Sequence, residues 1–185
     1  MHEIMATVFP EPQALNDVHA FHALFGAYVG AMPAIPAQDI CDLRINLLQE
    51  ELNELAEAIQ NKDIVEVADA LTDLQYVLSG AVLAFGLQDR FAALFAEVQR
   101  SNMSKACTTL EEAEATAKWY LTEKNMASSI VEKDGKYIVL RAGDSKVLKS
   151  IAYSPAQLAP LVETPVDTSQ GFRVDALQEN PHPQA

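Results

Sequence analysis

Residues 47–76 read LLQEELNELAEAIQNKDIVEVADALTDLQY, and this stretch decides the fold. Its apolar residues recur with the helical period on both sides of a polar break at residues 60–63. The pattern predicts two antiparallel helices joined by a short turn. The first is expected from about Ala37 or Gln38 to Ile59. The second is expected from Asp63, a good N-cap residue, to Gly86.

Two acidic pairs lie in this hairpin, and the members of each pair are three residues apart. Glu51 and Glu54 are on the first arm, and Glu66 and Asp69 are on the second. Residues three apart share a helix face. Both pairs are symmetric about residue 60, so Glu54 is expected to face Glu66, and Glu51 to face Asp69. The sequence therefore predicts four carboxylates that converge between two packed helices.

A cluster of carboxylates needs a cation or bound protons, because like charges repel at short range. Between Asp42 and Asp73 the chain has nine acidic residues against Arg44 and Lys62. Oxygen ligands suit hard ions, so Mg²⁺ is expected, with Mn²⁺ or Ca²⁺ as alternatives. The competing interpretation is a solvated acidic face on an amphipathic hairpin. For Glu66 a capping-box bond at the helix start is a further alternative.

The whole chain has 185 residues, enough for one domain with a modest appendage. Its formal net charge of −13 argues against nucleic acid or an anionic membrane as a partner. Cys41 and Cys107 lack the spacing of metal ligands and are expected as buried or inert thiols of a reducing compartment. Without a secretion signal or a long apolar run, a soluble cytoplasmic protein is expected.

Three further helices flank or follow the hairpin. Asn16 is expected to cap a first helix whose His19 and His22 are more typical of packing or of a surface position than of metal binding. A fourth helix is expected at residues 89–99, and a fifth follows Thr109 as its cap up to about Lys124. The apolar stripes expected to face the core are Leu48, Leu52, Leu55 and Ile59, then Val67, Leu71, Leu74 and Leu78, then Phe91, Leu94, Phe95 and Val98.

After residue 125 the period changes to two. Residues 129–133 and 136–141, joined by Asp134 and Gly135, predict a β-hairpin, and residues 146–149 predict a third strand. The fold class is therefore mainly α, an antiparallel bundle of four to five helices with a small C-terminal β-meander. The expected organisation is an irregular N-terminal arm (1–15), a helical catalytic domain (16–125), the β-meander appendage (126–162) and a disordered tail (163–185).

Two groups of basic and polar residues stand out in this acidic chain. Arg100-Ser-Asn-Met-Ser-Lys105 ends the fourth helix. Its cations either interact favourably with the C-terminal end of the helix dipole or bind phosphate. Arg141, Lys146, Lys149 and Tyr153 follow in the β unit. They either reach a bound anion or protect an edge strand from pairing.

The motif of Glu50-Glu51-x-x-Glu54 followed by Glu66-x-x-Asp69 resembles the EExxE…ExxD signature of the all-α nucleoside triphosphate pyrophosphohydrolases. That superfamily includes MazG-like proteins, dimeric dUTPases, dCTP pyrophosphatases and phosphoribosyl-ATP pyrophosphohydrolase. The resemblance covers roughly residues 16–106. It implies that Mg²⁺ bound to the carboxylates holds a triphosphate, and that water releases pyrophosphate and a nucleoside monophosphate.

The resemblance also implies roles for single residues. Glu51, Glu54, Glu66 and Asp69 would be the metal ligands, and Glu50 would orient or deprotonate the attacking water. Asp73, Tyr76, Asn102 and Lys105 would contact the nucleotide. Family members associate through their helices, so a homodimer or homotetramer is implied, with side chains shared across the interface.

The β-meander is not expected in a dedicated enzyme of histidine biosynthesis. A nucleotide-pool enzyme acting on dUTP or a non-standard nucleoside triphosphate is therefore the first functional hypothesis. Phosphoribosyl-ATP is the alternative substrate. A non-enzymatic helical module that binds a divalent cation, and a dimerisation domain with a solvated acidic face, are the rival readings.

Overall fold

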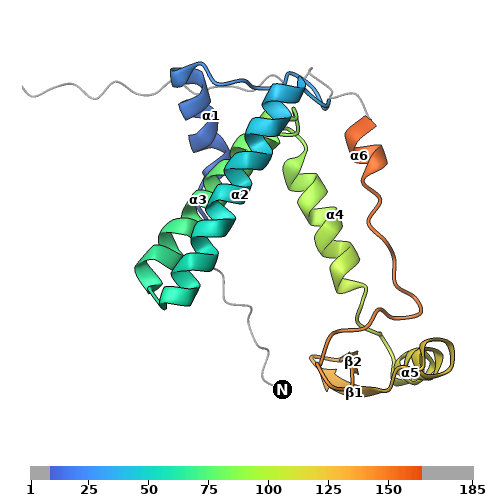
Figure 1. Ribbon diagram of the computed structural model, residues 1–185. Coiled ribbons are helices and arrows are strands. Elements are labelled where there is room, and N and C mark those ends of the chain that lie inside the picture. The colour runs from blue at the N-terminus through green and yellow to red at the C-terminus, as the bar shows by residue number, and fades with distance from the viewer. Residues whose placement is uncertain (1–8, 164–185) are drawn as a thin grey trace, which may run out of the picture.

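The computed structural model describes residues 9–163, which form six helices and one two-stranded sheet (Figure 1). In chain order the elements are α1 (Ala14–Phe25), α2 (Gln38–Asn61), α3 (Ile64–Ala84), α4 (Phe91–Met103), α5 (Leu110–Lys124), β1 (Ser128–Lys133), β2 (Lys136–Arg141) and α6 (Ala159–Glu163). The predicted fold class, mainly α with a small C-terminal β unit, is confirmed. None of the helices in the described part of the chain has the length and apolarity to cross a membrane.

The long hairpin of α2 and α3 forms one arm of the molecule (Figure 1). Asp63 caps α3 as predicted, because its Oδ1 accepts hydrogen bonds from the backbone N–H groups of Val65 at 3.0 Å and Glu66 at 3.3 Å. Gly86 lies just beyond the other end of α3 with φ +68°, and a Cβ there would lie 2.0 Å from the carbonyl oxygen of Met32. Glycine therefore ends the helix and lets the loop after α1 cross close to it.

Helix α1 packs on α3 near the base of the hairpin, where Val18 and Leu83 are each 1% exposed. The prediction that Asn16 caps α1 is wrong. The N–H of Asp17 donates to the carbonyl of Gln13, so the first turn closes earlier and α1 begins at Ala14. Asn16 is thus inside the helix.

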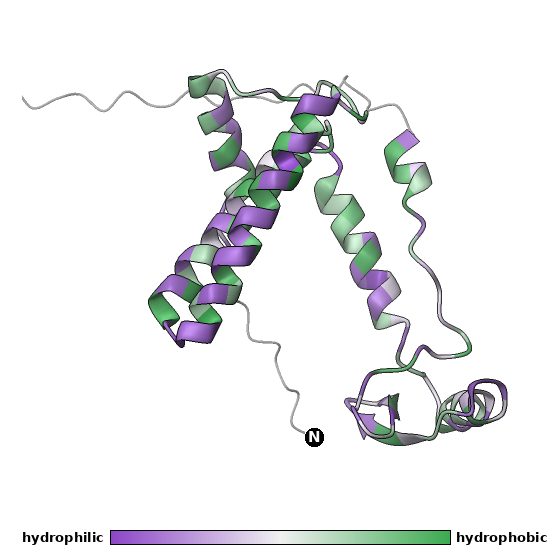
Figure 2. Cartoon of the chain, in the orientation of Figure 1, coloured by the Kyte–Doolittle hydropathy of each residue, from purple (hydrophilic) through white to green (hydrophobic). Residues whose placement is uncertain are grey.

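The predicted core stripes are only partly buried. Leu52 is 50% exposed, Ile59 58%, Leu71 51% and Phe95 67%. Two helices that pack mainly on each other can bury one side of each, and α4 diverges from the hairpin instead of covering the other side (Figure 1). Figure 2 shows apolar residues along the ribbons of both α4 and the hairpin. This single chain therefore leaves large apolar side chains in solvent.

A second packed unit forms at the far end of α4 from α5, β1 and β2. Its core contains Cys107, Ala113, Val139 and Leu148. Thr109 caps α5, since its Oγ1 accepts from the N–H of Glu112. The two strands are antiparallel, with Ser128 opposite Arg141 and Lys133 opposite Lys136. The β unit thus packs on α5.

The predicted third strand is a single bridge between Leu140 and Val147. The chain pairs only briefly because the N–H of Ser150 already donates to the carbonyl of Lys105, which draws the chain toward α4. From there it runs back beside α4 to α6 (Figure 1), held by Arg90 Nη1, which donates to the carbonyl of Leu161 at 2.8 Å. Of the arm predicted for residues 1–15, residues 1–8 lie outside the described residues, residues 9–13 have no helix or strand, and residues 14–15 belong to α1. The tail predicted for residues 163–185 lies outside the described residues except for Glu163, which ends α6.

Candidate active site

The turn between α2 and α3 sets which acidic residues meet. Lys62 takes a left-handed conformation with φ +56°, and the N–H of Asp63 donates to the carbonyl of Ala58 at 3.1 Å. This is a Schellman motif, which ends α2 at Asn61. The hairpin therefore folds about residue 62, two positions later than the predicted centre at residue 60. The shift places Glu51 level with Asp73 and moves Glu54 toward Asp69.

Glu51 is the carboxylate that the hairpin encloses most. Its Oε2 atom is buried, and within residues 9–163 it has no hydrogen-bond partner. Burial raises the pKa of Glu51 above its ordinary value, and the neighbouring charges of Glu54, Asp73, Glu50 and Asp69 raise it further, in that order. The order agrees with the register of the turn, because Asp73 acts on Glu51 more strongly than Asp69 does.

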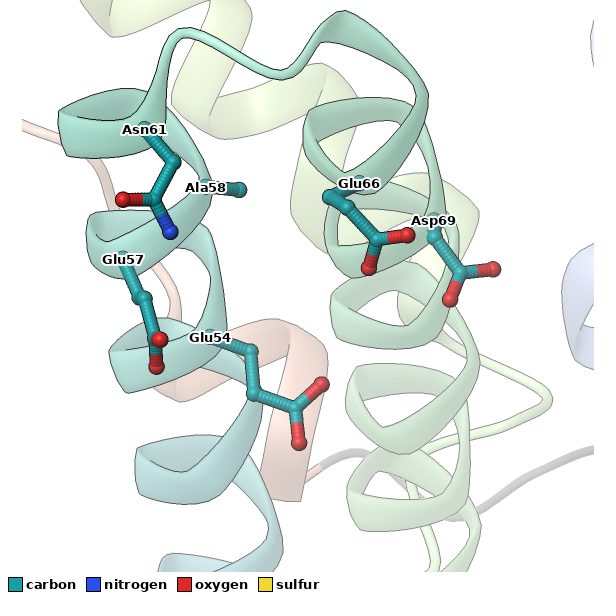
Figure 3. Close-up of a pocket in the computed structure, with 6 residues that line it drawn as sticks. All are labelled: Glu54, Glu57, Ala58, Asn61, Glu66 and Asp69. Atoms are coloured by element: carbon teal, nitrogen blue, oxygen red, sulfur yellow. The ribbon is translucent and has the colours of Figure 1, made fainter.

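A hollow of about 370 Å³ lies next to Glu51, closer to the turn. It is lined by Glu54, Glu57, Ala58, Asn61, Glu66 and Asp69 (Figure 3). In Figure 3 the side chain of Glu54 extends from α2 toward α3, where Glu66 and Asp69 lie one turn apart. We call this space the acidic hollow. It contains three of the four predicted metal ligands, and the fourth, Glu51, lies beside it.

The four predicted ligands share a face but do not converge on one point. In the described part of the chain, no three His, Cys, Asp or Glu side chains stand close enough to hold a metal ion as they are oriented. Mutual repulsion of the carboxylates favours such divergence. The prediction of four carboxylates meeting at one spot is therefore wrong in its geometry, although the residues come from the expected two helices.

The donor set nevertheless fits a hard divalent cation. The two ion pairs found within residues 9–163 are Glu97 with Arg100 and Asp144 with Arg141, so no base neutralises the hairpin acids there. The buried and unpartnered Oε2 of Glu51 is a ready ligand atom. The capping-box alternative for Glu66 does not hold, because the N–H of Asp63 already donates to Ala58. The carboxylate of Glu66 is thus available to bind a cation.

The remaining predicted site residues divide into two groups. Glu50 is exposed on α2 beside Glu51, and Asp73 lies on α3 within the electrostatic reach of Glu51. Tyr76 is 39% exposed, and its ring meets that of Phe21 edge to face at 5.8 Å. These three residues lie on the hairpin, in position to extend the site.

Asn102 and Lys105 lie elsewhere in this chain. They stand at the end of α4 remote from the hairpin (Figure 1), where Lys105 Nζ donates to Asn102 Oδ1 at 2.8 Å. Nearby, Ser101 Oγ and the Tyr153 hydroxyl are 3.0 Å apart, and Lys149 Nζ lies 4.3 Å from the Tyr153 ring centre. Their distance from the carboxylates means that one chain does not bring the two halves of the predicted site together.

The sequence interpretation missed Glu57, Asn61 and Phe21. Glu57 lies three residues after Glu54 and continues the same acidic stripe, so the spacing that revealed Glu54 also indicates Glu57. Asn61 and Phe21 carried no such signal. Asn61 joins the hollow only through the turn, and Phe21 only through the packing of α1 on α3.

The hairpin of two long helices with clustered carboxylates is the arrangement expected from the resemblance to one class of hydrolases, the all-α nucleoside triphosphate pyrophosphohydrolase superfamily. Comparison with protein families finds a match between the helical part of this chain and a family of that class. More narrowly, residues 18–102, a little under half of the chain, match the family described as Phosphoribosyl-ATP pyrophosphohydrolase. Members of that family are pyrophosphohydrolases, which act on phosphoric anhydride bonds. A search of curated proteins finds no match to the chain.

Proposed function

We propose that this protein hydrolyses a nucleoside triphosphate to the nucleoside monophosphate and pyrophosphate in a reaction that depends on Mg²⁺, with Mn²⁺ as a substitute. The observation that carries the proposal is the Oε2 atom of Glu51, which is buried and has no hydrogen-bond partner among the described residues, while acids from both helices flank it. Carboxylates held this close together destabilise the folded state unless a bound cation neutralises their charge.

Glu51, Glu54, Glu66 and Asp69 would hold the metal, which neutralises phosphate charge and lowers the pKa of a bound water. Glu50, exposed on α2 beside Glu51, would accept the proton of the attacking water. Asp73 and Tyr76 would position the nucleotide farther along α3, with Phe21 supporting the Tyr76 ring.

Two substrates are candidates. The first is a nucleoside triphosphate of the nucleotide pool, such as dUTP or a non-standard nucleotide. The second is phosphoribosyl-ATP, which the family match of residues 18–102 favours. Both release pyrophosphate from a triphosphate, so the acidic hollow alone does not distinguish them.

We also propose that two copies assemble to complete each site. Leu52, Ile59, Leu71 and Phe95 are each at least half exposed, and burying apolar surface of this kind is the main driving force for association. The cations near Lys105 complement the acidic hairpin in sign. Association that sets the α4 end of one copy against the hairpin of the other would bring Asn102 and Lys105 to the carboxylates.

A panel of nucleotides, each with Mg²⁺, Mn²⁺ or a chelator, tests the reaction. Pyrophosphate and monophosphate should appear in equal amounts for at least one nucleotide, and the chelator should abolish turnover. Release of single phosphates in steps, or no turnover of any nucleotide by a folded protein, would refute the proposal. Glu114→Gln, at an exposed acid on α5 away from the hairpin, is the matched control.

A further inference from the structure

Arg44 on α2 is a buried cation without a counter-ion in the described chain. It is 7% exposed, its Nε atom has no hydrogen-bond partner within residues 9–163, and neither ion pair found there includes it. Burial lowers the pKa of its guanidinium. The chain has 26 acidic residues against 13 basic ones, yet none of the described acids forms an ion pair with Arg44. Buried guanidinium groups are normally paired, so an unpaired one indicates a binding function.

His22 from α1 lies over the same part of α3 as Arg44. It is 3% exposed, and its Nδ1 lies 3.1 Å from the carbonyl oxygen of Tyr28. A carbonyl only accepts, so Nδ1 carries the proton and Nε2 has a free lone pair. A Cβ at Gly80 would lie 2.9 Å from Arg44 Nη1 and 3.3 Å from His22 Nε2. The absence of a side chain at Gly80 therefore makes room for both groups.

The position of this pair relative to the carboxylates indicates what it would bind. Arg44 precedes Glu51 by seven residues, which is two turns of the same helix face, or about 10 Å along α2. One arm of the hairpin thus presents a cation-binding carboxylate and, two turns away, a buried guanidinium beside an imidazole. A ligand with a metal-bound polyphosphate at one end would extend in this direction past Asp73 and Tyr76.

We infer that Arg44 and His22 form a subsite for a phosphate group, separate from the acidic hollow. The guanidinium fork matches two phosphate oxygens, and His22 Nε2 can accept the proton of a hydrogen phosphate. A second phosphate on the substrate, at the end opposite the triphosphate, is one source of this group, and free phosphate is the other. The first source rests on the proposed function. Phosphoribosyl-ATP has such a second phosphate, whereas simple nucleoside triphosphates do not.

Binding is tested on the full-length protein without metal, by following the imidazole signals of His22 in NMR spectra. Inorganic phosphate and ribose 5-phosphate are the probes, and chloride at equal ionic strength is the control. Both probes should shift the His22 signals saturably and raise the pKa of His22, which burial and then the charges of Arg44 and His19 lower in the free protein. Arg44→Gln should weaken binding at least tenfold, whereas Lys118→Gln, at an exposed cation on α5, should not.

Equal shifts in wild type and Arg44→Gln, or equal shifts with phosphate and chloride, would overturn the subsite. If Arg44→Gln fails to fold, Arg44→Lys replaces it, because lysine keeps the charge and loses the fork. Kinetics then separate the two sources. A second substrate phosphate predicts that the Arg44 variant raises KM at least tenfold for phosphoribosyl-ATP and less than threefold for dUTP or ATP. Free phosphate as the ligand predicts no such difference between substrates.

The outcomes for the two proposals are distinguishable. A wild-type protein that hydrolyses no nucleotide but binds phosphate at His22 would refute the proposed function and leave the subsite in place. If the protein hydrolyses nucleotides but neither probe shifts the His22 signals, the subsite alone would be refuted.

Discussion

The N–H of Asp63 donates to the carbonyl of Ala58 at 3.1 Å, and this bond fixes how α3 lies along α2. With the turn centred on Lys62, Asp73 becomes a close neighbour of Glu51, and Glu66 and Asp69 border the acidic hollow with Glu54. The charge distribution of the site therefore depends on one turn outside it. The predictions below follow from this arrangement and from the packing around it.

Replacing Glu51 with Gln should lower kcat/KM at least a hundredfold. The amide preserves the size of the side chain but removes the charge that a divalent cation requires. Steady-state kinetics with saturating Mg²⁺ measure the effect, and Glu114→Gln on α5 should stay within twofold of wild type. Retention of more than a tenth of the activity in Glu51→Gln would exclude Glu51 as a metal ligand.

Glu51 should also make the metal-free protein less stable as pH rises. Its pKa is raised in the folded state, so the folded protein binds more protons than the unfolded chain between the ordinary pKa of 4.5 and the raised value. The contribution of Glu51 to the free energy of unfolding therefore decreases as pH rises through that interval and stays low above it. Urea denaturation of wild type and Glu51→Gln at several pH values, in the presence of a chelator, measures this contribution of Glu51 to the free energy of unfolding. Parallel pH profiles for the two proteins would contradict it.

Mg²⁺ should raise the melting temperature of the protein. Binding to the folded state at a hundred times Kd contributes about 2.7 kcal/mol, which corresponds to roughly 5–10 °C for a chain of this size. Calorimetry with and without Mg²⁺ measures the shift, which should shrink in Glu54→Gln and Asp69→Asn. If neither Mg²⁺ nor Mn²⁺ changes the melting temperature of the wild-type protein, the result would favour the interpretation that the acidic residues form only a solvated helix face.

Two inactive variants should complement each other when mixed. If Lys105 acts on the hairpin of the second copy, a heterodimer of Glu51→Gln and Lys105→Ala has one intact site. Unfolding and refolding an equimolar mixture should restore about a quarter of wild-type activity, since half of the dimers are mixed and each has one good site. A mixture no more active than its components would show that Lys105 does not act across the interface.

Gly86→Ala should destabilise the base of the hairpin by about 2–4 kcal/mol. The added Cβ would lie 2.0 Å from the carbonyl oxygen of Met32, and φ of +68° is strained for any residue with a side chain. Denaturant unfolding measures the loss. Gly135→Ala, in an open turn where φ is +71° but no atom lies within 4 Å of the added Cβ, serves as the control that has the strain without the clash.

The helices and the β-hairpin of this protein could be predicted from its amino-acid sequence, because their causes are local. The helical period set α2 and α3, the Asp63 and Thr109 side chains set the starts of α3 and α5, and Asp134-Gly135 set the β-hairpin. It also indicated which carboxylates share the hairpin.

Three features became visible only in the folded chain: the register of the hairpin, the divergence of α4, and the convergence of Arg44 and His22 over Gly80. A two-residue change in the turn centre leaves every helical period unchanged yet brings a different acid beside Glu51. The direction of α4 and the burial of Arg44 depend on contacts between residues far apart in the chain. Periodicity does not encode such contacts, because it describes one helix at a time.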